Sequence, residues 1–212
     1  MIRILCADLT TADAALYGEV YRRLYDHASE ERRRRADRYR RFDDKLRCVV
    51  ADALLRMSLG NDRFTIVKNE AGKPRVEDYE NFYYNISHSG RYVVVASGNS
   101  NVGVDVQRHD AGIDRMAVAE QYFSPDEQIY VGQSLRRFYE VWTGKESYLK
   151  YTGEGLRRHM SSFSILGGIL HENSDAHPRI RSLNSLPDCG YSLSLCTADA
   201  EYTFELLDVR QL

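Results

Sequence analysis

The stretch "NISHSGRYVVVASGNSNVGVDVQ", from Asn85 to Gln107, decides the fold that the sequence predicts. Two runs rich in β-branched residues, Tyr92–Ala96 and Val102–Gln107, are typical of strands. Between them, Gly98–Asn101 has the Gly, Asn and Ser composition of a tight turn. We therefore expect a β-hairpin here, preceded by a short β-rich segment that begins at Asn85.

The chain before this hairpin contains helical and extended patterns. Ser29 is a suitable N-cap, because Glu30 and Glu31 follow it in the first turn, where carboxylates favour the helix dipole. The expected elements are a strand over residues 1–9, helices over 10–27, from Ser29, and from Asp43 or Asp44 to about Gly60, and a strand–turn–strand over 63–76.

After the hairpin, "FSPDEQ" predicts a helix start: Ser124 caps, Pro125 takes the first helical position and Glu127 completes a capping box. We expect a longer helix over about 133–151, strands within 161–170, 191–198 and 201–209, and a loop over 171–179. This order is not a regular βαβ alternation. It predicts an α+β fold with two halves, 1–101 and 102–212, each with helices on a small, mostly antiparallel sheet.

The composition argues against several classes of protein. The net charge of −2 over 212 residues does not suggest a nucleic-acid binder. No apolar run reaches membrane-spanning length, and the N-terminus lacks the apolar core of a signal peptide. The cysteines form no C-x-x-C pair, so we expect reduced structural thiols, no zinc site and a cytoplasmic location. They are Cys6, Cys48, Cys189 and Cys196.

Asp105 and Gln107 share one face of the predicted strand, opposite its valines. Gly103 lies on the same face and would leave room beside the carboxylate. Mg²⁺ takes oxygen ligands and often shares them with substrate phosphates, so Asp105 is a candidate ligand. From this strand alone, a solvent-facing aspartate is the simpler interpretation.

Glu146 and Lys150 lie four residues apart on the predicted helix, on a stripe separate from its apolar one. Taken alone, they predict a surface ion pair, which contributes only a few tenths of a kcal/mol. The alternative is that both side chains point at one ligand.

The segment "RRRRADRYRRFDDKLR", Arg32 to Arg47, contains nine basic residues. It is either a solvated face or a surface that attracts phosphate, of a nucleic acid or of a small nucleotide. On a helix, one stripe would consist of Arg34, Arg38, Arg41 and Lys45.

The serines on either side of His88 suggest a Ser–His nucleophile. Adjacent strand residues point to opposite faces, however, and no G-x-S-x-G motif occurs. A histidine that offers its ring nitrogens to a phosphate fits this stretch better.

These motifs resemble, in their order, the 4′-phosphopantetheinyl transferase superfamily, and within it the single-chain type that activates surfactin synthetase. The similarity covers about Ser29 to Ile165. The matching motifs are "GKP" (72–74), "NISHS" (85–89), "VGVDVQ" (102–107), "YFSPDE" (122–127), "WTGKESYLK" (142–150), "GEGL" (153–156) and "SFSI" (162–165).

The resemblance implies a monomeric pseudo-dimer of two similar halves, with coenzyme A in the cleft between them. It implies Mg²⁺-dependent transfer of the 4′-phosphopantetheine arm to a serine of an apo acyl or peptidyl carrier protein, which releases adenosine 3′,5′-bisphosphate. It favours broad use in secondary metabolism and leaves open which carrier is modified.

The resemblance also implies metal ligands and catalytic residues. Asp105 and Glu146 match the acidic Mg²⁺ ligands, and Lys150 matches a lysine near the pyrophosphate. Gln107 stands where the surfactin type has a second acid, and its amide could still offer an oxygen or hold a metal-bound water. We expect Glu146 to accept the serine proton, while Lys150 and His88 stabilise the leaving phosphate.

The remaining matches concern coenzyme A itself. His88 matches a histidine at its phosphates, with Ser87 beside it as a lesser contact. The lysine of the "GKP" turn is Lys73. By the same resemblance, two basic residues, Arg32 and Arg35, fall near the 3′-phosphate, and Arg47 falls near the adenine.

Two other functions remain open from the sequence. Gln107 hints at a family member that binds coenzyme A without transferring anything. The basic segment 32–47 would instead serve a nucleic-acid-binding protein, although no recognised nucleic-acid motif accompanies it.

Overall fold

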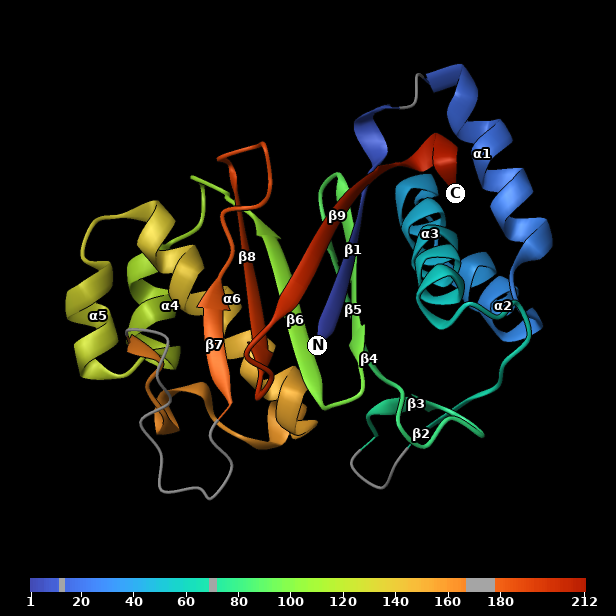
Figure 1. Cartoon of the computed structure of the whole chain (residues 1–212). Helices are drawn as coiled ribbons and strands as arrows, with labels where there is room; N and C mark the ends of the chain where they lie inside the picture. The colour runs from blue at the N-terminus through green and yellow to red at the C-terminus, as the bar shows by residue number, and fades with distance from the viewer. Residues whose placement is uncertain (12–13, 69–71, 167–177) are drawn as a thin grey trace.

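The computed structural model describes residues 1–11, 14–68, 72–166 and 178–212. Two sheets stand side by side at its centre, and each is covered by helices on its outer side (Figure 1). The predicted α+β fold with two helix-covered halves is confirmed.

The sheet of the N-terminal half has the strand order β4–β5–β1–β9. Its strands are β1 (Ile2–Asp8), β4 (Tyr83–Ser89), β5 (Tyr92–Gly98) and β9 (Tyr202–Asp208). After the 3₁₀ turn η1 (Leu9–Thr11), its helices are α1 (Ala14–His27), α2 (Glu30–Arg38) and α3 (Phe42–Leu59). Apolar residues of α3 such as Val50 and Leu54 are buried with Val93 and Val95 of β5 in one core, which fixes α3 on the sheet.

The sheet of the C-terminal half has the order β6–β8–β7. Its strands are β6 (Val102–Arg108), β7 (Arg179–Ser182) and β8 (Tyr191–Thr197). Its helices are α4 (Arg115–Tyr122), α5 (Pro125–Val131) and α6 (Leu135–Thr152), and the 3₁₀ turns η2 (Gly155–Arg157) and η3 (Met160–Ser162) follow α6.

Helix α6 approaches β6 closely at Gly103. A Cβ atom at this position would lie 2.0 Å from the backbone oxygen of Ser147 and 2.5 Å from the backbone nitrogen of Tyr151. The expectation that Gly103 leaves open space is therefore wrong, because the backbone of α6 fills that space.

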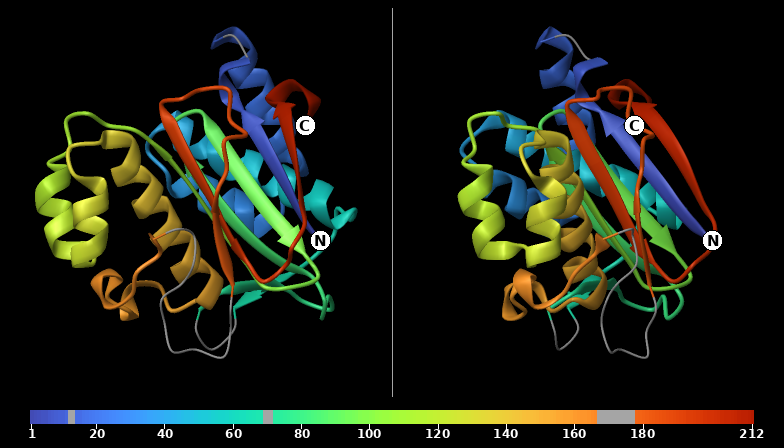
Figure 2. Two further views of the ribbon diagram at one scale, coloured as in Figure 1. Left: turned by 60° about the vertical axis from the view of Figure 1, so that its left-hand side comes forward. Right: turned by 90° about the vertical axis from the view of Figure 1, so that its left-hand side faces the viewer.

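The last strand of the chain crosses back to the N-terminal half. Strand β9 pairs in parallel with β1, in a register that runs from Ile2 opposite Tyr202 to Asp8 opposite Asp208, and the two strands lie side by side in both views of Figure 2. The 3₁₀ turn η5 (Val209–Gln211) follows it. The C-terminal residues thus complete the N-terminal sheet, while the division near residue 101 stays a prediction.

Local signals predicted the helix ends well. The Ser29 hydroxyl accepts a hydrogen bond from the Arg32 amide at 3.2 Å, as an N-cap should. Helix α3 ends at Gly60, which adopts a φ of 67°. At α5, Ser124 and Glu127 form the predicted capping box. None of the helices in the described ranges combines the length and apolar character needed to cross a membrane.

Two predictions about local structure were wrong, those of the hairpin and of the basic stripe. Strands β5 and β6 belong to different sheets, so Gly98–Asn101 links the halves and closes no hairpin. The strand expected within 161–170 stays a prediction, because 161–166 form no regular strand and 167–170 lie outside the described residues, while β7 begins at Arg179, the last residue of the predicted loop. The backbone is extended at Tyr39 and Arg41, so the basic segment is divided between α2 and α3 and the predicted stripe is not continuous.

The other late strands agree with the sequence. Strands β8 and β9 lie within the two later predicted ranges, and the 63–76 segment contains the pair β2 (Ile66–Lys68) and β3 (Pro74–Val76). These two short strands pair antiparallel, as predicted. The turn residues 69–71 and the segment 167–177 lie outside the described residues.

Candidate active site

Strands β4 and β6 lie side by side where the two halves meet, but among the described residues no backbone ladder joins them. Side chains of β4 bond the backbone of β6 instead. The Asn85 Oδ1 atom accepts from the Val104 amide at 3.0 Å, and the Ser87 hydroxyl accepts from the Val106 amide at 3.2 Å. Two residues further along each strand, the Ser89 hydroxyl accepts from the Arg108 amide at 3.0 Å.

This joint explains the alternation in "NISHS". Residues two apart on a strand share a face, so Asn85, Ser87 and Ser89 all point at β6. They satisfy backbone donors that would otherwise be buried without a partner, which is costly. The sequence analysis gave no role to Asn85 or Ser89; the polar residue at every second position of the motif was the signal that could have revealed them.

A cluster of three polar side chains forms at the centre of this joint. The Lys150 ammonium lies 2.7 Å from Asp105 Oδ1 and 3.1 Å from the Ser87 hydroxyl. The Ser87 hydroxyl donates to Asp105 Oδ1 at 2.8 Å. Asp105 is only 2% exposed, so the simpler interpretation of a solvent-facing aspartate is wrong. Residues from both halves are therefore required to build this cluster.

Glu146 lies one helical turn before Lys150 on α6 and lines the same cleft. Lys150 pairs with Asp105, and no described residue bonds the Glu146 carboxylate, so the predicted surface ion pair between Glu146 and Lys150 does not form. Burial, and next the negative charge of Asp105, raise the pKa of Glu146, although Lys150 opposes the shift. This carboxyl group can therefore take up a proton more readily than an ordinary glutamate.

Gln107 extends the cluster along β6. Its Nε2 atom donates to Asp105 Oδ2 at 3.3 Å, and its Oε1 atom accepts from the Ser89 hydroxyl at 3.4 Å. In this orientation the amide nitrogen faces the carboxylate. Rotation of the amide by half a turn would point its oxygen there instead, as a metal ligand requires.

His88 lines the cleft from β4, beside the cluster. Burial lowers its pKa first, and the positive charges of Arg47, Lys150 and Arg35 lower it further. A neutral imidazole at neutral pH keeps one N–H donor for a phosphate oxygen.

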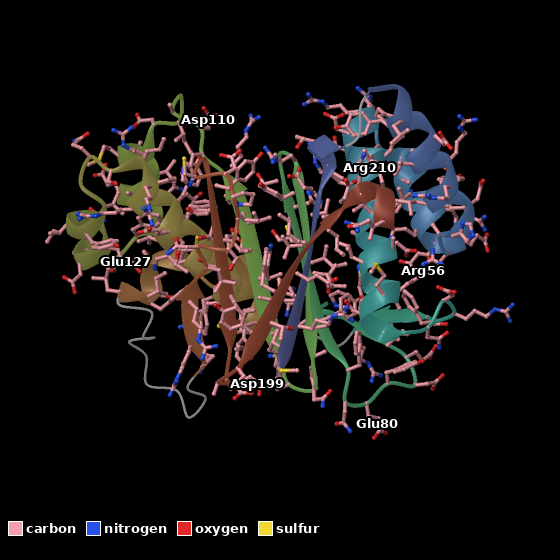
Figure 3. All side chains as sticks on the ribbon, turned by 45° about the horizontal axis from the view of Figure 1, so that its top comes forward. Arg56, Glu80, Asp110, Glu127, Asp199 and Arg210 are labelled. Atoms are coloured by element: carbon pink, nitrogen blue, oxygen red, sulfur yellow. The ribbon has the colours of Figure 1, made fainter. Side chains whose placement is uncertain are left out.

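The cleft has a volume of about 600 Å³, and basic residues of α2 line it together with the cluster. Arg32 and Arg35 of α2 both line it. The Arg32 Nε atom lies 3.4 Å from Asp52 Oδ1, and the guanidinium of Arg56 binds the other oxygen of the same buried carboxylate at 2.7 Å. Asp52 belongs to α3, as does Arg56, which Figure 3 labels, so this helix holds Arg32 in place.

Two predicted ligand residues lie elsewhere. Arg47 donates to the Gly90 carbonyl at 2.9 Å and to Asp44 at 2.8 Å, and it lines a separate cavity of about 340 Å³. Lys73 does not line the main cleft, although its neighbours Gly72 and Pro74 do. The structure thus brings together eight of the ten predicted site residues: Arg32, Arg35, Ser87, His88, Asp105, Gln107, Glu146 and Lys150.

Lys145, which precedes Glu146, faces away from the cleft. It is fully buried and binds Glu127 at 2.8 Å and the Met160 carbonyl at 2.8 Å. Glu127 lies on the outer side of the C-terminal half (Figure 3). This buried pair ties α5, α6 and the segment after α6 together, so the lysine next to the candidate base is a structural residue.

Comparisons with known proteins agree with this geometry. Residues 101–202 match the family model described as the 4′-phosphopantetheinyl transferase superfamily. Residues 18–100 match a model of the N-terminal part of 4′-phosphopantetheinyl transferases. These two matches meet at the junction of the two halves.

Curated relatives include 4′-phosphopantetheinyl transferase psf-1 of Bacillus pumilus, which is 32% identical over 188 residues, covering 80% of this chain and 78% of the relative. The transferase gsp of Aneurinibacillus migulanus is 34% identical over 69% of this chain and 65% of its own length. The transferase Sfp of Bacillus subtilis is 27% identical over 90% of this chain and 91% of its own length. The predicted family and the predicted transferase activity are confirmed: the chain belongs to the 4′-phosphopantetheinyl transferase superfamily.

Proposed function

We propose that the cleft binds coenzyme A and that the chain transfers its 4′-phosphopantetheine arm to a serine of an apo acyl or peptidyl carrier protein, releasing adenosine 3′,5′-bisphosphate. The observation that carries this proposal is the Ser87–Asp105–Lys150 cluster at the joint of the halves, with the unpaired Glu146 carboxylate beside it. An ammonium next to two carboxylates suits a reaction in which a pyrophosphate bond breaks.

The basic residues of the cleft support a mode of coenzyme A binding. This molecule carries a pyrophosphate and a separate 3′-phosphate on its ribose. Lys150 and His88 would hold the pyrophosphate at the cluster, while Arg32 and Arg35 of α2 would hold the 3′-phosphate. By the resemblance, Arg47 remains a predicted contact of the nucleotide and Lys73 is expected near it, although neither side chain lines this cleft.

The donor set fits a magnesium ion. Asp105 and Glu146 are close enough for the charge of one to raise the pKa of the other, a repulsion that a divalent cation relieves. The described residues contain no group of three His, Cys, Asp or Glu side chains suited to a metal, so the remaining ligands would come from substrate phosphates, water and Gln107. Mg²⁺, when bound, would neutralise charge that develops on the pyrophosphate oxygens.

The chemical step requires a base and a stabilised leaving group. The carrier serine attacks the phosphorus that bears the pantetheine arm, and the bond from this phosphorus to the bridging oxygen breaks. Glu146 accepts the serine proton, directly or through a water. Lys150 donates to the oxygen that leaves with adenosine 3′,5′-bisphosphate, and His88 donates to the same phosphate.

The test is transfer measured by intact mass. Wild-type protein, coenzyme A, Mg²⁺ and an apo carrier should yield a carrier that has gained one phosphopantetheine. Glu146→Gln should lower kcat by about a hundred-fold to ten-thousand-fold, the usual contribution of a general base. The matched control is Glu140→Gln, because Glu140 is on the same helix but pairs with Arg136 outside the cleft.

Three outcomes separate the alternatives. Wild-type activity in Glu146→Gln would refute the role of this residue as the base. Coenzyme A binding without any carrier modification would favour a binding protein that has lost transfer. Tight, salt-sensitive DNA binding without coenzyme A binding would favour a nucleic-acid function of segment 32–47.

The chain offers both walls of the cleft, which supports a monomer as the active form. All four cysteines are free thiols, three of them buried, which supports a reducing, cytoplasmic location. The proposed partners are coenzyme A and a carrier protein. We expect analytical ultracentrifugation to show a single species with the mass of a monomer.

A further inference from the structure

The hairpin formed by β2 and β3 is one wall of the proposed coenzyme A cleft. Ile66 and Lys68 of β2 and Gly72 and Pro74 around β3 line it. The hairpin stands at the edge of the molecule, apart from the two larger sheets (Figure 1), and pairs with no third strand among the described residues. Isolated two-stranded hairpins are marginally stable in water, so this wall depends on its anchors.

One anchor is apolar and lies at the end of β3. Val76 is 1% exposed and belongs to the core beneath α3, together with Tyr84 at the start of β4. The partly buried Ile66 packs against the same core. These contacts fix the open end of the hairpin, so the end near the turn needs a second anchor.

Lys73 is that second anchor. Its ammonium donates to Asn101 Oδ1 at 2.5 Å, to the Val102 carbonyl at 3.1 Å and to the Tyr151 carbonyl at 2.9 Å. A lysine ammonium has three donors, and these three acceptors engage all of them. Lys150 also meets three acceptors, at Ser87, Asp105 and the Val104 carbonyl, but Lys150 lines the cleft, whereas Lys73 does not.

The acceptors belong to a closely packed part of the junction. Asn101 donates through Nδ2 to the Tyr151 carbonyl at 2.6 Å and accepts from the Val102 amide at 3.1 Å. The backbone of Tyr151 also presses against Gly103 of β6. Lys73 is therefore tied to the start of β6 and the end of α6 at once.

We infer that Lys73 is a positioning residue, which fixes the hairpin wall against the junction of the halves and supports coenzyme A binding without touching a phosphate. This inference rests on the proposed function of the cleft. Burial lowers the pKa of Lys73 to about 8, so at neutral pH the side chain is still an ammonium with three donors.

The test compares coenzyme A with 3′-dephospho-coenzyme A. Lys73→Met should raise the Kd and KM of both by the same factor, about ten-fold, as expected for a lost hydrogen-bond network around a charge. The kcat at saturating nucleotide should stay within about two-fold, because binding that is equal in ground and transition states changes KM alone. A loss for coenzyme A alone would overturn the inference and make Lys73 a phosphate ligand.

Arg75→Met is the matched control. Arg75 is an exposed basic residue of β3 in the same hairpin, and it does not line the cleft. Its loss should leave the Kd of 3′-dephospho-coenzyme A unchanged. An equal loss in both variants would mean that the positive charge of the hairpin, and not the anchor, supports binding.

Hydrogen exchange supplies a readout that needs no transfer. Lys73→Met should speed exchange of the β2 amides, Ile66–Lys68, and of the Arg75 and Val76 amides in β3, and leave the β8 amides protected. Asn101→Ala removes an acceptor from the other side and should reproduce the effect. Unchanged exchange in both variants would refute the anchor, whereas failure of the wild type to bind coenzyme A would refute the proposed function alone.

Discussion

The two halves of the chain are joined along two strand edges, and the two joints are built differently. At one, β9 pairs with β1 through a continuous parallel backbone ladder. At the other, three side chains of β4 replace the ladder and bind alternate amides of β6. A backbone ladder tolerates most side chains, whereas a side-chain joint requires particular ones, and only the second joint contains the candidate site.

This difference shows how the site is assembled. A side-chain joint brings polar atoms to a buried surface, and Ser87 uses its hydroxyl both for the β6 backbone and for Asp105 and Lys150. The same atom thus joins the halves and orients two catalytic residues. We expect substitutions at this joint to reduce activity and stability together, and those at the β1–β9 joint to reduce neither by much.

Ser87→Ala should give the largest effect of the changes that compare the two joints. It leaves the buried Val106 amide without an acceptor, which costs about 1–3 kcal/mol of unfolding free energy. It also frees Asp105 and Lys150 from their shared partner, and we expect kcat/KM to fall about ten-fold to a hundred-fold, as for other residues that orient site ligands. Urea unfolding and steady-state transfer kinetics measure the two effects.

Ser89→Ala is the control for this prediction. Ser89 makes the same kind of bond, but its partner Arg108 is exposed and water can replace the hydroxyl. We expect a small loss of stability and near-normal kcat/KM. If Ser87→Ala retained wild-type kcat/KM, the joint would hold the halves together without positioning the site.

Local signals in the sequence predicted much of the fold. The caps at Ser29 and Ser124 and the helix end at Gly60 depend on a few neighbouring residues, and all three are confirmed. The predicted hairpin was wrong although Gly98–Asn101 has turn chemistry, because β5 pairs with β4, which precedes it, and with β1, which is distant in sequence, and not with β6. Local composition predicts a turn but cannot reveal which strand pairs with which.

The same contrast between local signals and contacts distant in sequence applies to the site. Family motifs pointed to Asp105, Glu146 and Lys150, and these side chains do meet in the cleft. What the sequence could not show was their contacts, since Lys150 pairs with Asp105 across two elements rather than with Glu146 on its own helix. Lys73 differs most, because its acceptors come from residues about 30 and 80 positions away in the chain.

Glu146→Gln should raise stability while it lowers activity. Burial and the charge of Asp105 raise the pKa of Glu146, so the folded protein binds its proton more tightly than the unfolded chain does. Above the folded pKa, the ionised carboxylate therefore destabilises the fold, and a neutral amide removes that cost. The stability gain should be full above the folded pKa and should vanish as pH falls below the unfolded pKa, and thermal unfolding at a series of pH values measures it.

The same measurement at the β1–β9 joint gives the smallest effect. Arg3 and Glu205 face each other across this joint at 3.2 Å, with side chains that are 45% and 50% exposed. Exposed ion pairs contribute about 0–1 kcal/mol, because solvent and salt screen them. Glu205→Gln should therefore change unfolding free energy by less than about 0.5 kcal/mol, with no gain at neutral pH and no change in kcat/KM. A loss of activity here as large as that in Ser87→Ala would mean that the backbone ladder also positions the site, and the contrast between the two joints would not hold.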